Sequence, residues 1–175
     1  MRIAHPQTAF SLLELLVSLT IVGVVTAAGL PPLQRWTATR ALDSAVFDLQ
    51  RDLHHARLTA ARTGHSIALC PSLSARRCDA GATFDDGWIS FINHDGDSPV
   101  QRDVDEPVLR THAGSTNIRL LSNRRAFRQS PPGRRSINGT IIACHRDAGV
   151  APRSLVVSYT GRARTSQSNG TGGCP

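Results

Sequence analysis

The chain has 175 residues, which is room for one domain with an appendage and too little for a second large domain. Its formal net charge of +7 and isoelectric point near 10.8 point to an anionic partner or surface, although the exclusive use of arginine, with no lysine, also fits a GC-rich genome. The four cysteines permit two disulfides if the domain leaves the cytoplasm.

The segment from Phe10 to Leu30 is almost wholly apolar, apart from Glu14 near its start. A helix of this length, rising about 1.5 Å per residue, is long enough to span a hydrocarbon core of about 30 Å. The short flank before it carries Arg2 and no acidic residue, so the positive-inside rule keeps that end cytoplasmic and predicts export of the rest. A plain signal anchor, with Glu14 near the membrane interface, is the alternative interpretation.

Residues 9–16 read AFSLLELL and resemble the class III signal of type IV pilins and type II secretion pseudopilins. The resemblance implies that prepilin peptidase cuts between Ala9 and Phe10, and that Phe10 is then N-methylated. Ala9 stands where the family usually has glycine, and it is small enough for processing. Cleavage would create an α-amino group at Phe10, and we expect Glu14 of a neighbouring subunit to pair with it, because a lone carboxylate among apolar helices needs a partner.

The next segment predicts a second helical stretch. Pro31 and Pro32 are expected to break or kink the apolar helix, and Pro31 also matches the family's helix-breaking proline. Beyond them, apolar residues recur at steps of three and four as far as about Arg62, and Gly64 is a stop signal. The apolar face comprises Leu42, Val46, Leu49, Leu53, Ala56 and Ala60. We interpret the other side as a solvated mixed-charge face, made of Asp43, Asp48, Arg51, Asp52, His55 and Arg62.

After Gly64 the pattern becomes one of short β-rich runs between turn residues. The runs are 65–70, 87–93, 108–112, 117–121, 140–145 and 154–160. One long helix followed by short strands predicts an α+β fold, the type IV pilin fold, in which the helix packs on an antiparallel β-sheet domain. We expect four parts: a leader peptide (1–9), a transmembrane and filament-core helix (10–30), its amphipathic continuation (31–63) and a β-rich globular domain with a basic C-terminal half (64–175).

Four cysteines allow three pairings. We predict Cys70–Cys78, which closes a short loop, and Cys144–Cys174, which ties the C-terminus to a strand. In the chain-entropy estimate, a closed loop of about 30 residues stabilises the fold by roughly 3–4 kcal/mol. The cysteine spacings do not suit zinc, so no metal is expected.

Acidic residues are dense between residues 93 and 106. Close carboxylates around a glycine are compatible with calcium, but the spacing does not reproduce the twelve-residue calcium loop, and we interpret the segment as a solvated turn. No local signature organises a serine and a histidine as nucleophile and base. The sequence therefore predicts neither an enzyme nor a cofactor.

Charge is unevenly divided along the β-rich domain. Residues 76–110 hold four arginines and eight acids, a net charge of −4, whereas residues 111–175 hold ten arginines and one acid, a net charge of +9. Such asymmetry is typical of a polyanion binder, and it also fits a solvated basic surface or one that docks an acidic neighbour in a filament. At residues 154–164, SLVVSYTGRAR, a strand is expected to run into Gly161, placing Arg162 and Arg164 on one face about 6–7 Å apart, close to the phosphate spacing of a nucleic-acid strand.

This last element resembles the C-terminal GRxR element of GspH/FimT-type minor pilins, and the resemblance covers nearly the whole chain. It implies that Gly161, Arg162 and Arg164 bind DNA, for uptake in natural transformation. From charge alone we add Arg146, Arg153, Arg134 and Arg135.

The implied partners are double-stranded DNA, other major and minor pilins, prepilin peptidase and, before assembly, the inner membrane. The implied location is the inner membrane, through a single N-terminal helix with a periplasmic domain, and then an extracellular pilus. Two other functions remain open: a structural minor pilin that primes pilus assembly, with the basic face against other pilins, and a type II secretion minor pseudopilin.

Overall fold

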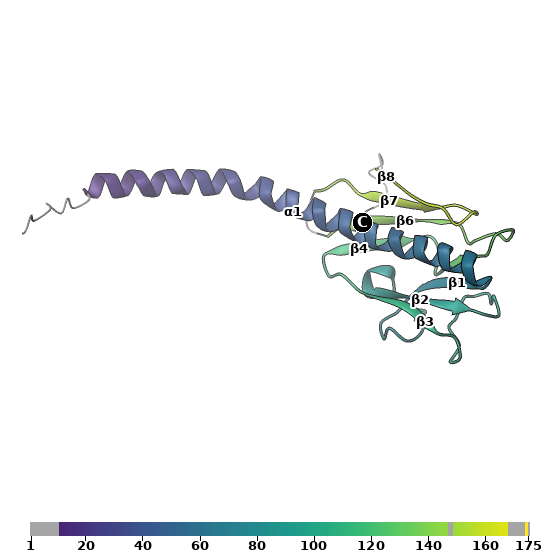
Figure 1. The fold of residues 1–175 in the computed structure, drawn as a ribbon. Coiled ribbons are helices and arrows are strands. Elements are labelled where there is room, and N and C mark those ends of the chain that lie inside the picture. The colour runs from purple at the N-terminus through teal and green to yellow at the C-terminus, as the bar shows by residue number, and fades with distance from the viewer. Residues whose placement is uncertain (1–10, 147–148, 168–173, 175) are drawn as a thin grey trace, which may run out of the picture. The chain divides into compact units, whose positions relative to one another are not determined.

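The computed structural model describes residues 11–146, 149–167 and 174, with side chains 28–31 and 167 left aside. Residues 1–37 and 38–175 form two compact units. One long helix, α1 (Leu12–Thr63), belongs partly to each, and the strands belong to the second unit (Figure 1). The strands, with the short 3-10 helix η1 (Phe84–Asp86) before β2, are β1 (Ser66–Pro71), β2 (Gly87–Asn93), β3 (Val108–Ala113), β4 (Ile118–Ser122), β5 (Phe127–Gln129), β6 (Gly139–His145), β7 (Arg153–Val157) and β8 (Ala163–Gln167).

Of the break or kink predicted at Pro31 and Pro32, the break is wrong, because α1 is one helix from Leu12 to Thr63. Proline already has a helical φ, and each proline removes only one backbone donor, so the turns on either side can hold the helix together. The helix start is capped by Ser11, whose Oγ accepts a hydrogen bond from the Glu14 N–H at 3.2 Å.

The N-terminal part of α1 is long and apolar enough to cross a membrane, with a mean hydropathy of 2.1 over its best window. Its large apolar side chains are exposed, among them Leu12, Leu13, Leu15, Leu16, Val17, Leu19, Ile21, Val22, Val24 and Val25. Such a surface requires lipid or neighbouring helices around it.

The described strands form two antiparallel four-stranded sheets, in the orders β3-β2-β1-β5 and β4-β6-β7-β8. The second half of α1 lies across them (Figure 1). Six of the strands coincide with the predicted runs, apart from shifts at their ends. The other two, β5 and β8, are absent from the prediction because β5 has three residues and β8, with the sequence ARTSQ, has no apolar alternation.

The predicted apolar face of α1 is buried against both sheets. All six of its residues belong to a core cluster that also contains Ile67 and Leu69 of β1, Phe127 of β5 and Leu155 of β7. A smaller cluster on the other face of the first sheet gathers Ala68, Ile89, Phe91 and Val100. Because both clusters lie entirely within residues 38–175, that unit carries its own core.

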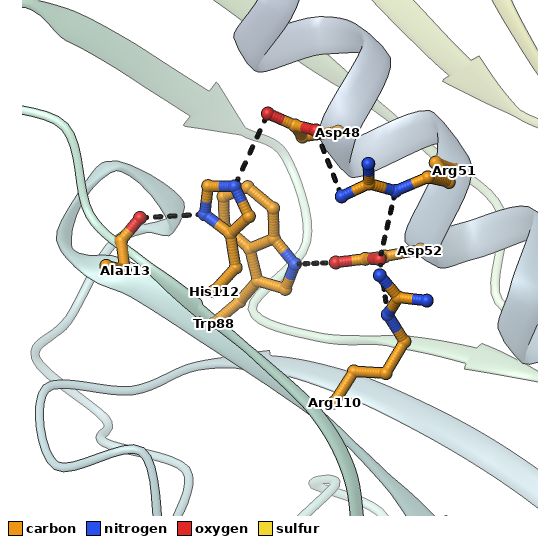
Figure 2. Close-up of polar contacts among 7 residues, drawn as sticks. All are labelled: Asp48, Arg51, Asp52, Trp88, Arg110, His112 and Ala113. Atoms are coloured by element: carbon orange, nitrogen blue, oxygen red, sulfur yellow. Dashed lines mark hydrogen bonds and ion pairs between the residues drawn. The ribbon is translucent and has the colours of Figure 1, made fainter.

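The charged side of α1 is not uniformly solvated, and the prediction is wrong for Asp52, which is 2% exposed. Its Oδ2 accepts a hydrogen bond from the Trp88 indole at 2.9 Å, and its Oδ1 lies 2.9 Å from Nε of Arg110 (Figure 2). Next to this pair, the ring of His112 stacks on Trp88 at 3.9 Å and its Nε2 lies 3.5 Å from Asp48. A carboxylate can be buried at this helix–sheet junction because it is paired there.

The acidic loop is also more ordered than a solvated turn, and that interpretation is wrong for Glu106. This side chain is 2% exposed, and its two oxygens accept hydrogen bonds from the backbone N–H groups of His94, at 2.7 Å, and Asp103, at 3.0 Å. Asp97 accepts another from the Gln101 N–H. The loop's carboxylates therefore serve as backbone acceptors.

Two disulfides close loops in the second unit. Cys70 is bonded to Cys78 and Cys144 to Cys174, with Cα separations of 5.5 Å and 5.9 Å. The first loop is further held by Asp79, whose carboxylate accepts a hydrogen bond from the Leu73 N–H at 2.8 Å. This bond and the neighbouring Arg77 guanidinium, 3.0 Å away, lower the pKa of Asp79 below its ordinary value of 3.8.

Candidate nucleic-acid interface

Gly161 lies in a tight turn between β7 and β8, so the predicted strand that runs straight into GRAR is wrong. The turn is closed by hydrogen bonds from the Gly161 N–H to the Ser158 carbonyl, 2.9 Å, and from the Ser158 N–H to the Arg162 carbonyl, 3.0 Å. Gly161 has a φ of +74°, and a Cβ there would collide with the side chain of Gln129. The left-handed backbone conformation favours glycine at this position, and any larger residue would also have to displace the end of the Gln129 side chain.

Arg162 follows the turn, and Arg164 lies in β8. Between them, Ala163 packs on the core, so alternation places the two arginines on the outer face of the second sheet. Val156, the cross-strand partner of Arg164, is 43% exposed on that face. Both arginines are exposed, and within the described part of the chain neither guanidinium has a hydrogen-bond or ion-pair partner.

The loop between β5 and β6 brings Arg134 and Arg135 beside the same turn. The Ser136 N–H donates to the Tyr159 carbonyl at 2.9 Å, which joins the loop to the turn through the backbone. The Arg135 guanidinium carbon lies 5.7 Å from the centre of the Tyr159 ring. Four of the arginines expected to bind DNA therefore gather at one end of the second sheet.

The other two, Arg146 and Arg153, lie away from this turn and are paired. The register Gly139↔Val157 and Ala143↔Arg153 places them at the opposite end of β6 and β7. Arg146 Nη2 is 3.1 Å from Asp85, and Arg153 Nε is 3.0 Å from Asp43. These ion pairs would have to open before either arginine could bind a phosphate.

A cleft beside the turn contains residues that sequence reasoning missed. It is lined by Arg57 and Leu58 of α1, by Pro131 and Pro132 of the β5–β6 loop, and by Tyr159. The sequence offered only weak signals, namely an arginine on a mixed-charge helix and the single tyrosine of the chain two residues before Gly161. The fold brings these segments together from distant positions in the sequence.

The remaining candidate residues lie near the N-terminus. Ala9 and Phe10 lie outside the described residues. Glu14 is exposed in the first turn of α1. Within residues 11–146, 149–167 and 174, no group of three or more His, Cys, Asp or Glu side chains is arranged to hold a metal ion.

Comparison with known families matched two segments of the chain. Residues 45–161 match the family described as type II transport protein GspH, and residues 5–30 match the prokaryotic N-terminal methylation motif. No curated protein matched the chain.

Two crystal structures of the type IV minor pilin FimU from Pseudomonas aeruginosa PAO1 resemble this fold. Their TM-scores are 0.51 and 0.52, with sequence identities of 19% and 18%. The matches cover 71% and 76% of this chain, and 92% of the FimU chain in each case. At such low identity the likeness concerns the fold alone, and it confirms the predicted type IV pilin fold.

Proposed function

We propose, on the premise that this chain belongs to the GspH family of minor type IV pilins and pseudopilins, that it binds extracellular double-stranded DNA for uptake in natural transformation. The methylation motif and the apolar helix mark a membrane-anchored pilin that is processed and assembled into a pilus with other pilins. The family is one of structural pilins rather than of known enzymes. DNA binding adds a ligand to that structural role.

One observation carries the proposal: Arg162 and Arg164 are exposed on one face, without a partner among the described residues, beside a turn in which Gly161 has a left-handed conformation. Arginines held at strand spacing can each approach one phosphate of a nucleic-acid backbone. Arg134 and Arg135 add positive charge beside the same turn, from the neighbouring loop. Arg146 and Arg153 contribute less, because each is engaged with a carboxylate.

Contacts of this kind read phosphate and not base edges, so binding is independent of sequence. Each arginine that neutralises a phosphate releases a counterion and adds about 0.9 to the slope of log affinity against log salt concentration. The proposed interface therefore binds unrelated duplexes with similar affinity and loses affinity steeply as salt rises.

The test uses the fragment 38–175, which holds both core clusters. Labelled duplexes of two unrelated sequences are titrated at two salt concentrations, with wild type and with Arg162→Ala/Arg164→Ala. The double substitution should weaken binding to both duplexes alike and lower the salt slope by about two. Circular dichroism establishes that the variant is folded.

The matched control is Arg146→Ala/Arg153→Ala, which removes the same charge from the other end of the sheet. It should keep most of the affinity. An equal loss in both variants would show that net charge, and not the turn, binds DNA. Absence of binding by wild type at low salt would refute the DNA function.

A structural role without DNA is the second candidate, and the family's description as a type II transport protein favours its secretion form. In it the chain primes pilus assembly or serves a secretion pseudopilus, and the arginines face other pilins. In either role we propose that Glu14 pairs with the amine of Phe10 in a neighbouring subunit. Glu14→Ala should then deplete the protein from sheared pili on immunoblots while the β-rich domain stays folded, and normal incorporation would contradict this pairing.

A further inference from the structure

We propose that the cleft beside the β7–β8 turn holds an unpaired nucleotide stacked on Tyr159, so that the domain binds single-stranded DNA in addition to duplex. The helix-side cleft, as we call it, lies between the end of α1, the β5–β6 loop and the turn, and its volume is about 640 Å³. That volume is within the range of small-ligand sites, about 300–1,000 Å³. This inference rests on the proposed DNA binding and adds a second form of the ligand.

Tyr159 is the centre of the site. Its side chain is 55% exposed although the ring is large, and its described ring contact is with the guanidinium of Arg135. The two residues line the helix-side cleft and also a second cleft on the side of Cys70 and Cys78, so they form a ridge between the two. An exposed aromatic ring backed by arginine offers a face on which a nucleobase can stack.

The lining of the helix-side cleft is both cationic and apolar, which suits a ligand with a negative charge and a flat apolar group. Its cations are Arg57, Arg134 and Arg135, and no acidic residue is among the described residues that line it. Apolar surface comes from Leu58, which is 43% exposed, and from two prolines of the loop. A nucleotide combines the two required features, since its phosphate suits the arginines and its base suits the ring and the apolar wall.

The same geometry separates single strands from duplexes. In a duplex the bases are stacked on one another, so the protein reaches mainly phosphate and groove edges. A ring in a cleft can stack only on a base that has left the stack, as in single-stranded DNA or a frayed end. Arg162 and Arg164, on the outer face of the sheet, can contact phosphate in either form.

The experiment compares two ligands and two variants of the fragment 38–175. The single-stranded probe is a short oligothymidylate, and the duplex probe has the same number of phosphates. Tyr159→Ala should weaken binding of the oligothymidylate about tenfold, as expected for the loss of one stacked base, and should change duplex binding by less than about twofold. Tyr159→Phe keeps the ring and should restore the affinity. The turn should persist in both variants, because its bonds to Ser136, Ser158 and Arg162 are made by the backbone.

A charge-matched probe isolates stacking from electrostatics. An oligomer of abasic sites with the same number of phosphates should bind wild type about as weakly as oligothymidylate binds Tyr159→Ala. Equal affinity of wild type for the abasic and thymidylate oligomers, or no loss in Tyr159→Ala, would overturn the stacking site. An equal loss of single-stranded and duplex binding in Tyr159→Ala would also overturn it, since the ring would then only support the turn.

The two proposals fail separately in this design. Duplex binding that depends on Arg162 and Arg164, without any effect at Tyr159, keeps the proposed function and refutes the stacking site. Stacking-dependent binding of oligothymidylate without duplex binding keeps the site and refutes duplex uptake. Absence of binding to either probe at low salt refutes both.

Discussion

Arginines occupy two contrasting settings in the β-rich unit. At the junction of α1 with β2 and β3, Arg51 and Arg110 pair with Asp48 and Asp52 (Figure 2). At the β7–β8 turn, the exposed guanidinia of Arg162 and Arg164 have no side-chain partner within the described residues. A charge paired with a buried carboxylate favours one arrangement of helix and sheet, whereas an exposed unpaired arginine adds little stability and stays accessible to an anion. The paired arginines at the helix–sheet junction therefore stabilise the fold, and the arginines of the turn are available to bind a ligand.

The largest expected effect on stability comes from removing the buried carboxylate at the helix–sheet junction. Asp52→Ala removes the acceptor of the Trp88 indole and the partner of Arg110. The free energy of unfolding of the fragment 38–175 should fall by about 3 kcal/mol, because a buried donor and a charge both lose their partner. Urea unfolding followed by circular dichroism measures it.

Asp48→Ala is the matched control for that change. Asp48 contacts Arg51 and His112 from a more exposed position, so its loss should cost about 1 kcal/mol or less. Equal costs for the two substitutions would contradict a special role for the buried carboxylate.

The next effect concerns the turn itself. Gly161→Ala places a Cβ against Gln129 at a φ of +74°, and it should destabilise the fragment by about 2 kcal/mol and weaken duplex binding. Gly133→Ala is the control, because Gly133 also has a positive φ, of 87°, but has open space around its Cβ position. It should cost about 1 kcal/mol. Equal costs in thermal melts would show that the contact with Gln129 has no weight.

The turn also shows what sequence could and could not predict. The helix, its apolar face and six strands follow from periodicity, and the arginines of GRAR were singled out by type and spacing. The hairpin was missed because β8 is polar, and because the left-handed conformation of Gly161 and its contact with Gln129 arise only in the folded chain. Burial of Asp52 and Glu106 was missed because their partners are brought to them only by the tertiary fold.

The candidate site was also predictable only in part, because residue type and charge follow from the sequence and three-dimensional neighbours do not. Charge alone added four arginines to the two of the GRAR element, and only the register of β6 with β7 divides these six between two ends of a sheet. Arg57 entered no prediction, because its place beside Tyr159 depends on how α1 packs. Pairing of Arg146 with Asp85 joins residues 61 positions apart, which no local pattern encodes.

A smaller effect is expected when the two pairs of arginines are replaced and the free energies of unfolding are compared. Arg162→Ala/Arg164→Ala should change the free energy of unfolding by less than about 0.5 kcal/mol, because these side chains have no described partner to lose. Arg146→Ala/Arg153→Ala should cost about 1 kcal/mol, since it opens two partly exposed ion pairs. Urea unfolding measures both, and a larger cost for the first pair would mean that the turn arginines are structural.

The smallest effect tests a partly buried charge that holds a loop. Asp79 has a pKa lowered below 3.8, first by the Leu73 N–H and then by Arg77. A lowered pKa means that the folded state holds the proton less tightly than the unfolded state, so the stabilisation is fully present above the unfolded pKa and is lost as pH falls through the folded one. Thermal midpoints of wild type and Asp79→Asn should therefore differ slightly at pH 6 and converge as the pH drops below about 4. A difference that persists unchanged at pH 2 would show that the ionised carboxylate does not secure the Cys70–Cys78 loop. The charge of Asp79 would then add nothing to the fold, like the charges of Arg162 and Arg164, which have no partner among the described residues.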